Sequence, residues 1–340
     1  MLRPSDVALG IALGLAAAIV QAQVAPADAS ASAAADSMPM RPAILFNRWQ
    51  EDWSVLADPR IPRERLDDLK YIPLAANDSK SWLSLGAGLR ERFEANDAAL
   101  LGTAGQMNQD YLISRAEVHA DLRVDPGLQM FVQLQSEFAP GKTQFTAVDR
   151  NRLDLEQAFI ALTEPAAGGM LKLRVGRQQY AFDLQRFVSV RDGPNVRQSY
   201  DAVWADYERG RWRFITFGSH PVQTRDTGAF DDSSSGKLTF SGARIERLLS
   251  ETASLAAYYA YYTQANARYP GARGNERRDI VDMRVMGTGS PLDWDFEAMW
   301  QTGSIGAEDI NAWAIGWVGG YTFAAALWKP RLGLQIYRYV

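Results

Sequence analysis

The chain has 340 residues, with 36 Lys and Arg against 40 Asp and Glu, and a formal net charge of −4 at pH 7. This acidic balance argues against nucleic acid as a partner. Cysteine is absent, which excludes disulfides, thiolate metal sites, cysteine nucleophiles and a lipidated cysteine anchor. No apolar run after residue 22 is long enough for a membrane-spanning helix.

The N-terminus has the features of a secretion signal. Arg3 gives a positive start, an apolar stretch runs from Val7 to Val20, and Val20-Gln21-Ala22 is a small-residue cleavage motif. We therefore expect a signal peptide over residues 1–22, removed near Ala22. Residues 23–40 are mostly Ala, Ser, Asp and Pro, and they are expected to form a disordered leader because they have little to bury.

Residues 41–80 combine large apolar side chains with charges. Trp49 and Trp53 lie among Leu, Tyr and charged residues, while Pro59 and Pro62 interrupt any long helix. This composition predicts a small packed segment on the periplasmic side, with one short helix over residues 63–69.

From Trp82 onward, apolar and polar residues alternate. Every second residue of 112–124 is small or apolar, and between them lie Arg115, Glu117, His119, Asp121 and Arg123. Successive strand side chains point to opposite faces, so each segment has one apolar and one charged face. A soluble sheet would bury the apolar face in a core, whereas a transmembrane barrel turns it to lipid and its charges to a wet lumen.

Similar alternation recurs along the chain, with turn signals between the runs, and it predicts a dozen or more strands over residues 81–340. The fold class expected is all-β, an antiparallel transmembrane β-barrel. Residues 153–162 fit no single face, because Leu155 and Phe159 alternate out of step with Ile160 and Leu162. The acidic and serine-rich stretch 228–236 is predicted to be an exposed loop that gates access.

Residues 171–197 form a basic segment. Six basic residues stand against Asp183 and Asp192, a net charge of +4, and Lys172 and Arg174 fall on the presumed lumen face. Guanidinium groups bind carboxylates in a bidentate manner and stay charged. One interpretation is that these residues bind anions. The other is a structural lattice in which they pair with acids, for which the candidates are Glu94, Glu117, Asp121, Asp183 and Asp192.

Several motifs resemble those of alginate-export outer-membrane barrels. They are Trp49-Gln50-Glu51-Asp52-Trp53-Ser54, Leu69-Lys70-Tyr71-Ile72-Pro73-Leu74, Leu89-Arg90-Glu91-Arg92-Phe93-Glu94, Val175-Gly176-Arg177-Gln178, Arg191-Asp192-Gly193-Pro194-Asn195-Val196-Arg197 and Ser199-Tyr200-Asp201. The resemblance implies an eighteen-stranded barrel with an arginine-lined lumen, gated by loops or a plug. Candidate substrate-binding residues are then Arg90, Arg92, Arg115, Lys172, Arg174, Arg177, Arg191 and Arg197. Candidate pairing or gating acids are Asp183, Asp192 and Asp201.

The end of the chain departs from this pattern. Outer-membrane barrels usually close on a strand with a terminal aromatic residue, whereas this sequence ends in Gln335-Ile336-Tyr337-Arg338-Tyr339-Val340. The predicted strands also fall short of eighteen. We therefore expect the barrel over residues 81–340 to be incomplete at its C-terminus, as a truncated form of a longer gene product.

The function expected is passive, facilitated diffusion of an alginate-like polyuronate across the Gram-negative outer membrane. Expected partners are outer-membrane lipid, the anionic polysaccharide and periplasmic export components. Two alternatives are a porin for small anions or other solutes, and a soluble secreted β-sheet protein that binds polysaccharide.

No enzyme is predicted, and no metal or cofactor. The sequence has two histidines, and neither lies in a catalytic or metal-spaced motif. His119 is expected in a solvated salt-bridge network between Glu117 and Asp121, and His220 is expected to be a turn residue before Pro221.

Overall fold

The computed structural model describes residues 40–75, 78–97, 108–124, 127–289 and 291–339, and the expected signal peptide and nearly all of the leader lie outside them. Helices are short in this part: η1 (Arg48–Gln50), η2 (Trp53–Ala57) and α1 (Asp67–Lys70). None of the described helices is long and apolar enough to cross a membrane.

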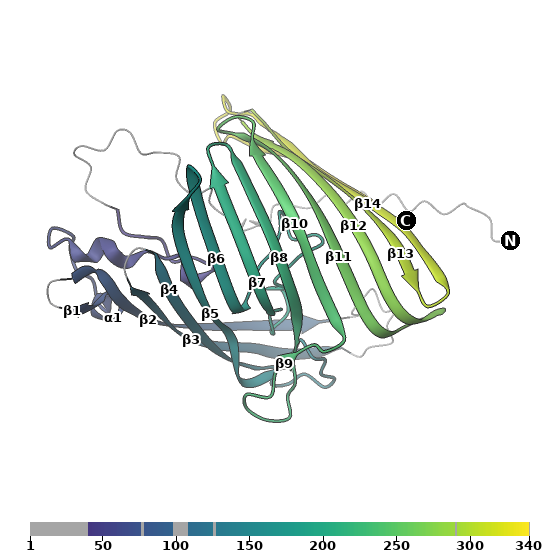
Figure 1. Ribbon diagram of the computed structural model, residues 1–340, viewed down its shortest axis with the longest axis horizontal. Coiled ribbons are helices and arrows are strands. Elements are labelled where there is room, and N and C mark those ends of the chain that lie inside the picture. Colours follow the sequence, from purple (N-terminus) through teal and green to yellow (C-terminus); the bar gives the residue numbers. More distant parts are fainter. Residues whose placement is uncertain (1–39, 76–77, 98–107, 125–126, 290, 340) are drawn as a thin grey trace. The chain divides into compact units, whose positions relative to one another are not determined.

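Strands dominate the described residues, as Figure 1 shows. There are fifteen, and the pairings between them are antiparallel: β1 (Ile72–Ala75), β2 (Asp78–Asn96), β3 (Gln109–Val124), β4 (Leu128–Phe138), β5 (Asn151–Ala166), β6 (Gly169–Gln178), β7 (Tyr200–Arg209), β8 (Trp212–Gln223), β9 (Ser233–Ser234), β10 (Leu238–Leu248), β11 (Ala253–Tyr269), β12 (Ala272–Thr288), β13 (Leu292–Ile305), β14 (Glu308–Thr322) and β15 (Arg331–Tyr339). The all-β antiparallel fold expected from the alternation is confirmed.

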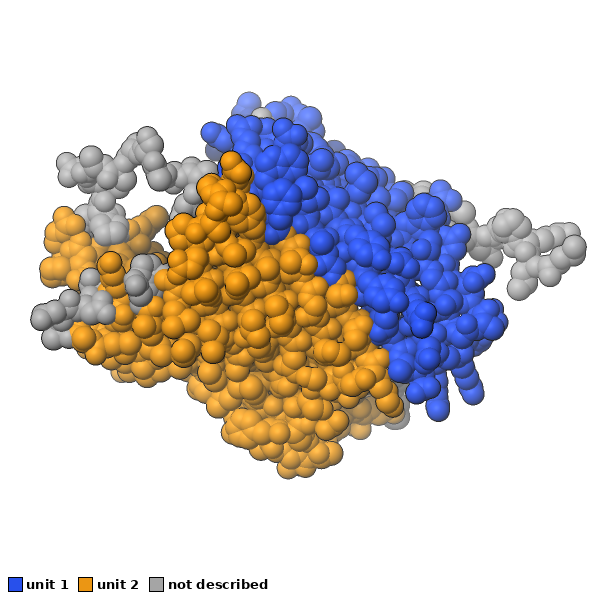
Figure 2. All heavy atoms as spheres, viewed as in Figure 1, with its two compact units in different colours: residues 1–23, 210–214, 242–340 blue, residues 24–209, 215–241 orange. Residues whose placement is uncertain are grey.

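The chain forms two compact units, coloured separately in Figure 2. One contains the described residues of 24–209 and 215–241, and in it β1 to β7 pair in chain order while β9 pairs with β8. The other contains residues 210–214 and the described residues of 242–340, and in it β11 to β15 pair in chain order.

The faces of the strands are inverted relative to a soluble protein. On β3, Arg115 and Asp121 are 1% and 2% exposed, whereas Val118 between them is 51% exposed. The second unit repeats the pattern, with Asp282 buried and its neighbour Val281 half exposed. Apolar side chains facing outward and charges facing inward are the arrangement of a transmembrane barrel. The soluble-sheet alternative is therefore wrong, because it requires the apolar face to be covered.

A β-bulge explains why residues 153–162 fit no single face. Gln157 of β5 pairs with Gln133 of β4, but the next pair joins Leu155 to Leu134, so Glu156 is an extra residue. Glu156 and Gln157 are both buried. One inserted residue reverses the facing of every residue beyond it. The bulge thus places two consecutive polar side chains on the same face, and a second register shift lies nearer the start of β5, between the pairs Gln135–Asp154 and Glu137–Asn151.

The N-terminal segment, residues 40–75, has a small core of its own. Its buried members are Trp53, Leu56, Ile61 and Tyr71, which pack with Trp82 of β2. The predicted helix over residues 63–69 is wrong in extent, because Leu66 adopts a left-handed backbone conformation (φ 77°) and α1 begins after it. The Asp67 carboxylate accepts two hydrogen bonds from Arg41, at 2.7 and 2.8 Å. These bonds lower the pKa of Asp67 to about 2.

Both histidines differ from their predictions. His119 is buried rather than solvated, and its ring stacks on Phe131 with centroids 5.9 Å apart. The acids flanking it have other partners, since Glu117 pairs with Arg197 and Asp121 pairs with Arg123. His220 lies inside β8, where its Nδ1 is 3.0 Å from the Ser235 carbonyl oxygen. Both histidine side chains therefore have packing or hydrogen-bond partners within the fold.

Candidate functional site

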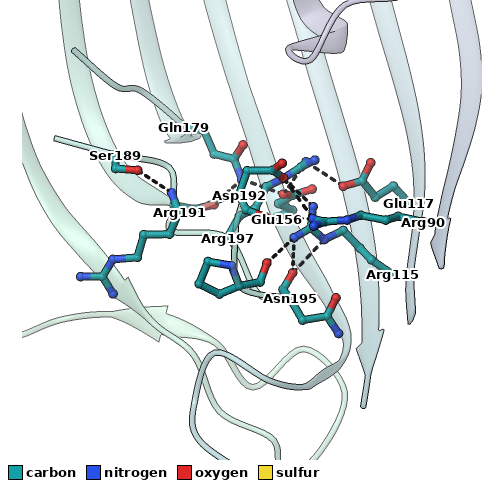
Figure 3. Close-up of polar contacts among 12 residues, drawn as sticks. Arg90, Arg115, Glu117, Glu156, Gln179, Ser189, Arg191, Asp192, Asn195 and Arg197 are labelled. Carbon is teal, nitrogen blue, oxygen red and sulfur yellow. Dashed lines mark hydrogen bonds and ion pairs between the residues drawn. The ribbon is translucent and has the colours of Figure 1, made fainter. Parts of the chain in front are cut away.

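The connection between β6 and β7, residues 179–199, folds back onto the polar faces of β2 to β5 (Figure 3). We call it the inward segment. Asn195 fixes its position, because the side-chain nitrogen lies within 3.1 Å of three carbonyl oxygens, those of Ser114, Phe138 and Asp149. The main-chain N–H groups of Asn195 and Val196 also donate to the carbonyl of Val148. Since buried polar groups need partners, these hydrogen bonds favour a single position of the segment on the strands.

Arg115 of β3 holds the inward segment from the strand side. Its Nη1 lies 2.8 Å from the Asp192 carboxylate, its Nη2 donates to the carbonyl of Pro194 at 2.8 Å, and its Nε donates to the carbonyl of Asn195 at 2.8 Å. Arg115 is almost fully buried. Asp192 keeps 44% of its side-chain surface, so loss of Arg115 would cost mainly the three hydrogen bonds that it makes to the segment, each worth about 0.5–1.5 kcal/mol or more. Arg115 therefore acts as an anchor of the segment.

Arg197 joins three acids at the other end of the same cluster. It lies 2.7 Å from Glu117, 2.9 Å from Asp192 and 3.3 Å from Glu156. Burial alone would lower the pKa of Arg197, but Glu156, Glu117 and Asp192 outweigh it and raise that pKa above its ordinary value. Burial would raise the pKa of Asp192, but Arg197 and Arg115 together hold it below its ordinary value. Both groups are therefore charged.

Asp192 is the centre of this cluster. Besides Arg115 and Arg197 it meets Arg90 of β2, whose Nη1 donates to its carbonyl at 2.9 Å and lies 3.6 Å from its carboxylate. Glu137 lies close enough to Glu156, Arg115 and Arg197 to interact electrostatically with them, and it is fully buried. Three guanidinium groups thus face four carboxylates. The guanidinium groups of Arg115 and Arg197 are directly paired with acids, which matches the structural lattice more closely than an open basic surface.

The other predicted residues have partners of their own. Arg92 pairs with Glu94 at 2.5 Å, and Lys172 pairs with Glu208 at 3.2 Å. Arg174 is buried, and its guanidinium lies over the ring of Trp49, 4.3 Å from the centroid. Asp183 lies in the inward segment with a left-handed backbone (φ 55°).

Arg177 lies outside the cluster around Asp192 and pairs with Asp201 at 2.9 Å. Its guanidinium also lies 3.9 Å from the buried carboxylate of Asp154. Ser234 of β9 also contacts Asp201, so the pair lies beneath that segment. Between Val175 and Arg177, Gly176 has φ +130°, and a Cβ there would lie 2.3 Å from the carbonyl oxygen of Ala158. This is the reason for glycine in that motif.

Arg191 is the exception among the predicted basic residues. It is exposed and has a left-handed backbone (φ 57°), and Figure 3 shows its side chain directed away from the cluster around Asp192. Within the described part of the chain, its guanidinium has neither a hydrogen bond nor an ion pair. Its backbone N–H donates to the Ser189 hydroxyl at 2.9 Å. The positive charge of Arg191 is therefore available to a ligand.

Comparison with known proteins identifies the family. The family model described as "Alginate export" matches residues 81–338. The chain belongs to the Alginate export family. This member is an outer-membrane β-barrel of a Gram-negative cell with a transport function, as the motifs predicted. No curated protein matches the chain.

Solved porins are similar to this Alginate export family member at low identity. The trimer form of OmpT from Vibrio cholerae is 11% identical over 76% of this chain and 88% of its own, with a TM-score of 0.36. OccAB1 of Acinetobacter baumannii is 11% identical over 76% and 78%, with a TM-score of 0.40. A mutant of the Rh. blastica porin is 13% identical over 75% and 100%, with a TM-score of 0.29.

Trp49 of this family member has a role that the sequence did not reveal. Its ring packs edge-on against Phe159 of β5 with centroids 5.8 Å apart, and its carbonyl accepts hydrogen bonds from Arg123 and Gln129 at 2.7 and 2.9 Å. Phe46 nearby lies under the Arg197 guanidinium, 4.4 Å from it. The N-terminal segment therefore covers the polar faces of several strands. The Trp-Gln-Glu-Asp-Trp motif was its only signal, and it did not say which tryptophan faces the strands.

Proposed function

We propose that this outer-membrane channel passes an anionic polysaccharide of the polyuronate class by facilitated diffusion, with no catalytic step. The observation that carries the proposal is the exposed guanidinium of Arg191, which has no partner among the described residues, beside a cluster of anchored arginines. Arg90 and Arg92 retain about a third of their side-chain surface, 30% and 34%. These three residues are the proposed cargo contacts, while Arg115 and Arg197 position the inward segment.

The mechanism follows from the strength of such contacts. Guanidinium groups replace water around each substrate carboxylate, and the exposed positive charge of Arg191 raises the local concentration of anions. Conduction also requires that each contact release its ligand. Acids close to the arginines serve this purpose, because Glu94 and Asp192 compete with the cargo for the same guanidinium groups. A polysaccharide that makes many weak contacts can then move through the channel without being trapped.

A second candidate is a porin for small anions, and the acids paired with the arginines of the Asp192 cluster favour it. Asp192 and Glu117 beside the arginines would repel a long polyanion more than they would a single small ion. Both candidates share an anionic cargo, so they predict the same ion selectivity and differ in the size of what passes.

The shared part of the proposal is tested by the reversal potential of the purified channel in a planar bilayer under a potassium chloride gradient. The expected result is a potential whose sign reports preference for chloride, and the preference should decrease as ionic strength rises because salt screens the exposed arginines. A preference for potassium would contradict both candidates.

A further inference from the structure

Three exposed arginines lie beside the turn between β11 and β12. Arg268 of β11 is the direct cross-strand partner of Arg273 of β12, and Arg277 follows further along β12. Within the described residues, none of the three guanidinium groups has a hydrogen bond or an ion pair. Like charges directly opposite each other on a sheet are destabilising, so the Arg268–Arg273 pair is unfavourable unless an anion binds there. We call these three residues the arginine patch.

The register of the strands places the arginine patch on the lipid-facing side of its unit. On β12, Asp282 is 1% exposed, whereas Val281 beside it is 50% exposed. Because side chains alternate along a strand, Arg273 and Arg277 share the face of Val281. Cross-strand partners also share a face, so Arg268 points the same way as Arg273. The patch therefore faces away from the polar lumen.

The arginine patch lies just beyond the apolar part of this face, at the level of a lipid headgroup. Val281 has Tyr259 of β11 and Trp300 of β13 as its cross-strand partners, so a row of two aromatic rings crosses the sheet there. Such rings mark the boundary between hydrocarbon and headgroups in barrels. Arg277 is about 13 Å further along β12 than Val281, and Arg273 lies beyond it. This order places the guanidinium groups where lipid phosphates lie.

The acids on the same face do not neutralise the arginine patch. The Asp279 carboxylate accepts a hydrogen bond from the Tyr259 hydroxyl. Asp309 of β14 faces the same way, but Ser304 of β13 lies between it and Arg277 in the register. Since neighbouring strands are about 4.8 Å apart, the main chains of Asp309 and Arg277 are about 10 Å apart. The headgroup level of this face therefore keeps an excess of positive charge.

We propose that the arginine patch binds the two phosphate groups of lipid A, the membrane anchor of lipopolysaccharide. Guanidinium groups bind phosphate oxygens in a bidentate manner. The acyl chains of lipid A begin directly below its phosphates, so they would cover the exposed side chains of Val281 and Met283. Three arginines spread over two strands suit a headgroup with two phosphates better than the single phosphate of a phospholipid. The β11–β12 turn then faces the cell exterior, where lipopolysaccharide resides.

The binding test uses the full chain refolded in detergent without lipopolysaccharide, titrated with diphosphoryl lipid A and followed by native mass spectrometry. Arg273→Ser combined with Arg277→Ser should weaken binding about 25-fold, because each arginine near an anionic lipid surface contributes about fivefold. Phosphatidylglycerol should bind more weakly than lipid A, and sodium phosphate should not displace lipid A. Equal binding of lipid A to the two proteins would overturn the assignment. Tighter binding of phosphatidylglycerol, or displacement by free phosphate, would overturn it too.

Two single variants keep the binding test sharp. Arg277→Ser alone should weaken binding of lipid A about fivefold, and it serves if the double variant does not fold. Arg211→Ser is the matched control, because Arg211 is also exposed but contacts the Leu249 carbonyl, near the opposite end of β11. It should bind lipid A like the wild type. An equal loss in Arg211→Ser and Arg277→Ser would contradict a site at the arginine patch.

The side of the membrane is tested separately in intact cells. The chain has no cysteine, so Ala307→Cys would place a single thiol in the β13–β14 turn. This turn adjoins the patch, since the Gly306 N–H donates to the Asn275 carbonyl at 3.0 Å. A maleimide coupled to a polymer too large for porins should label the thiol in intact cells. Labelling only after lysis would place the turn in the periplasm and overturn the assignment to lipopolysaccharide. Neither experiment depends on the cargo of the channel.

Discussion

Replacing Trp49 with alanine is expected to increase the single-channel conductance. Trp49 is the point at which the N-terminal segment contacts Phe159 and Arg174 on the polar face of the strands. An aromatic pair contributes about 0.5–1.5 kcal/mol, and a cation–π contact contributes about 0.5–2 kcal/mol. Loss of about 1.4 kcal/mol would shift the equilibrium between the bound and the detached N-terminal segment about tenfold toward the detached form. Released segments leave more of the polar lumen open to ions.

The measurement is the distribution of open-state conductances in planar bilayers at one salt concentration. Trp328→Ala is the matched control, since Trp328 is 89% exposed between β14 and β15 and its removal should leave the distribution unchanged. A W49A channel with wild-type conductance, together with a fold verified by its heat-dependent gel mobility, would show that the N-terminal segment does not restrict the pore.

Arg191→Glu is expected to weaken block of the channel by an oligouronate. Arg191 is the predicted cargo contact with no acidic partner in the described part of the chain, so its charge is fully available to a carboxylate. Hydrogen bonds to charged groups contribute about 1.5–3 kcal/mol, so the concentration that halves the conductance should rise about tenfold or more. The fold should be unaffected because the side chain is exposed.

The conservative variant Arg191→Lys separates charge from geometry. It keeps the positive charge but loses the planar fork that binds a carboxylate with two parallel bonds. Block should therefore weaken less in R191K than in R191E. If R191E and the wild type are blocked at the same oligouronate concentration, Arg191 is not a cargo contact and the division between anchoring and free arginines fails.

The fold was predictable because a two-residue alternation is a local signal. Val118 and Asp121 reveal the facing of β3 without knowledge of any other strand. The bulge at Glu156 was not predictable in the same way, since an inserted residue is recognised only from the partner strand. The pairing of Arg177 with Asp201 was not predictable either, because the two residues lie on neighbouring strands, 24 residues apart.

The sequence singled out several residues of the cluster around Asp192, but not the contacts between them. Arg115, Asp192 and Arg197 were all selected, but Asp192 is 77 residues from Arg115, and nothing local says that the segment folds inward. Asn195 was missed for a similar reason, since its three carbonyl partners come from two strands and one connection. Side chains that bond to backbone carbonyls far along the sequence leave no pattern that spacing can reveal.

The most direct test of the proposed cargo is conductance of the wild-type channel titrated with an oligouronate and with a neutral glucan of the same length. The account predicts that the oligouronate interrupts the current at concentrations where the glucan has no effect, because only the uronate carries carboxylates for Arg191, Arg90 and Arg92. Equal block by both polymers, or block by neither, would contradict a polyuronate channel.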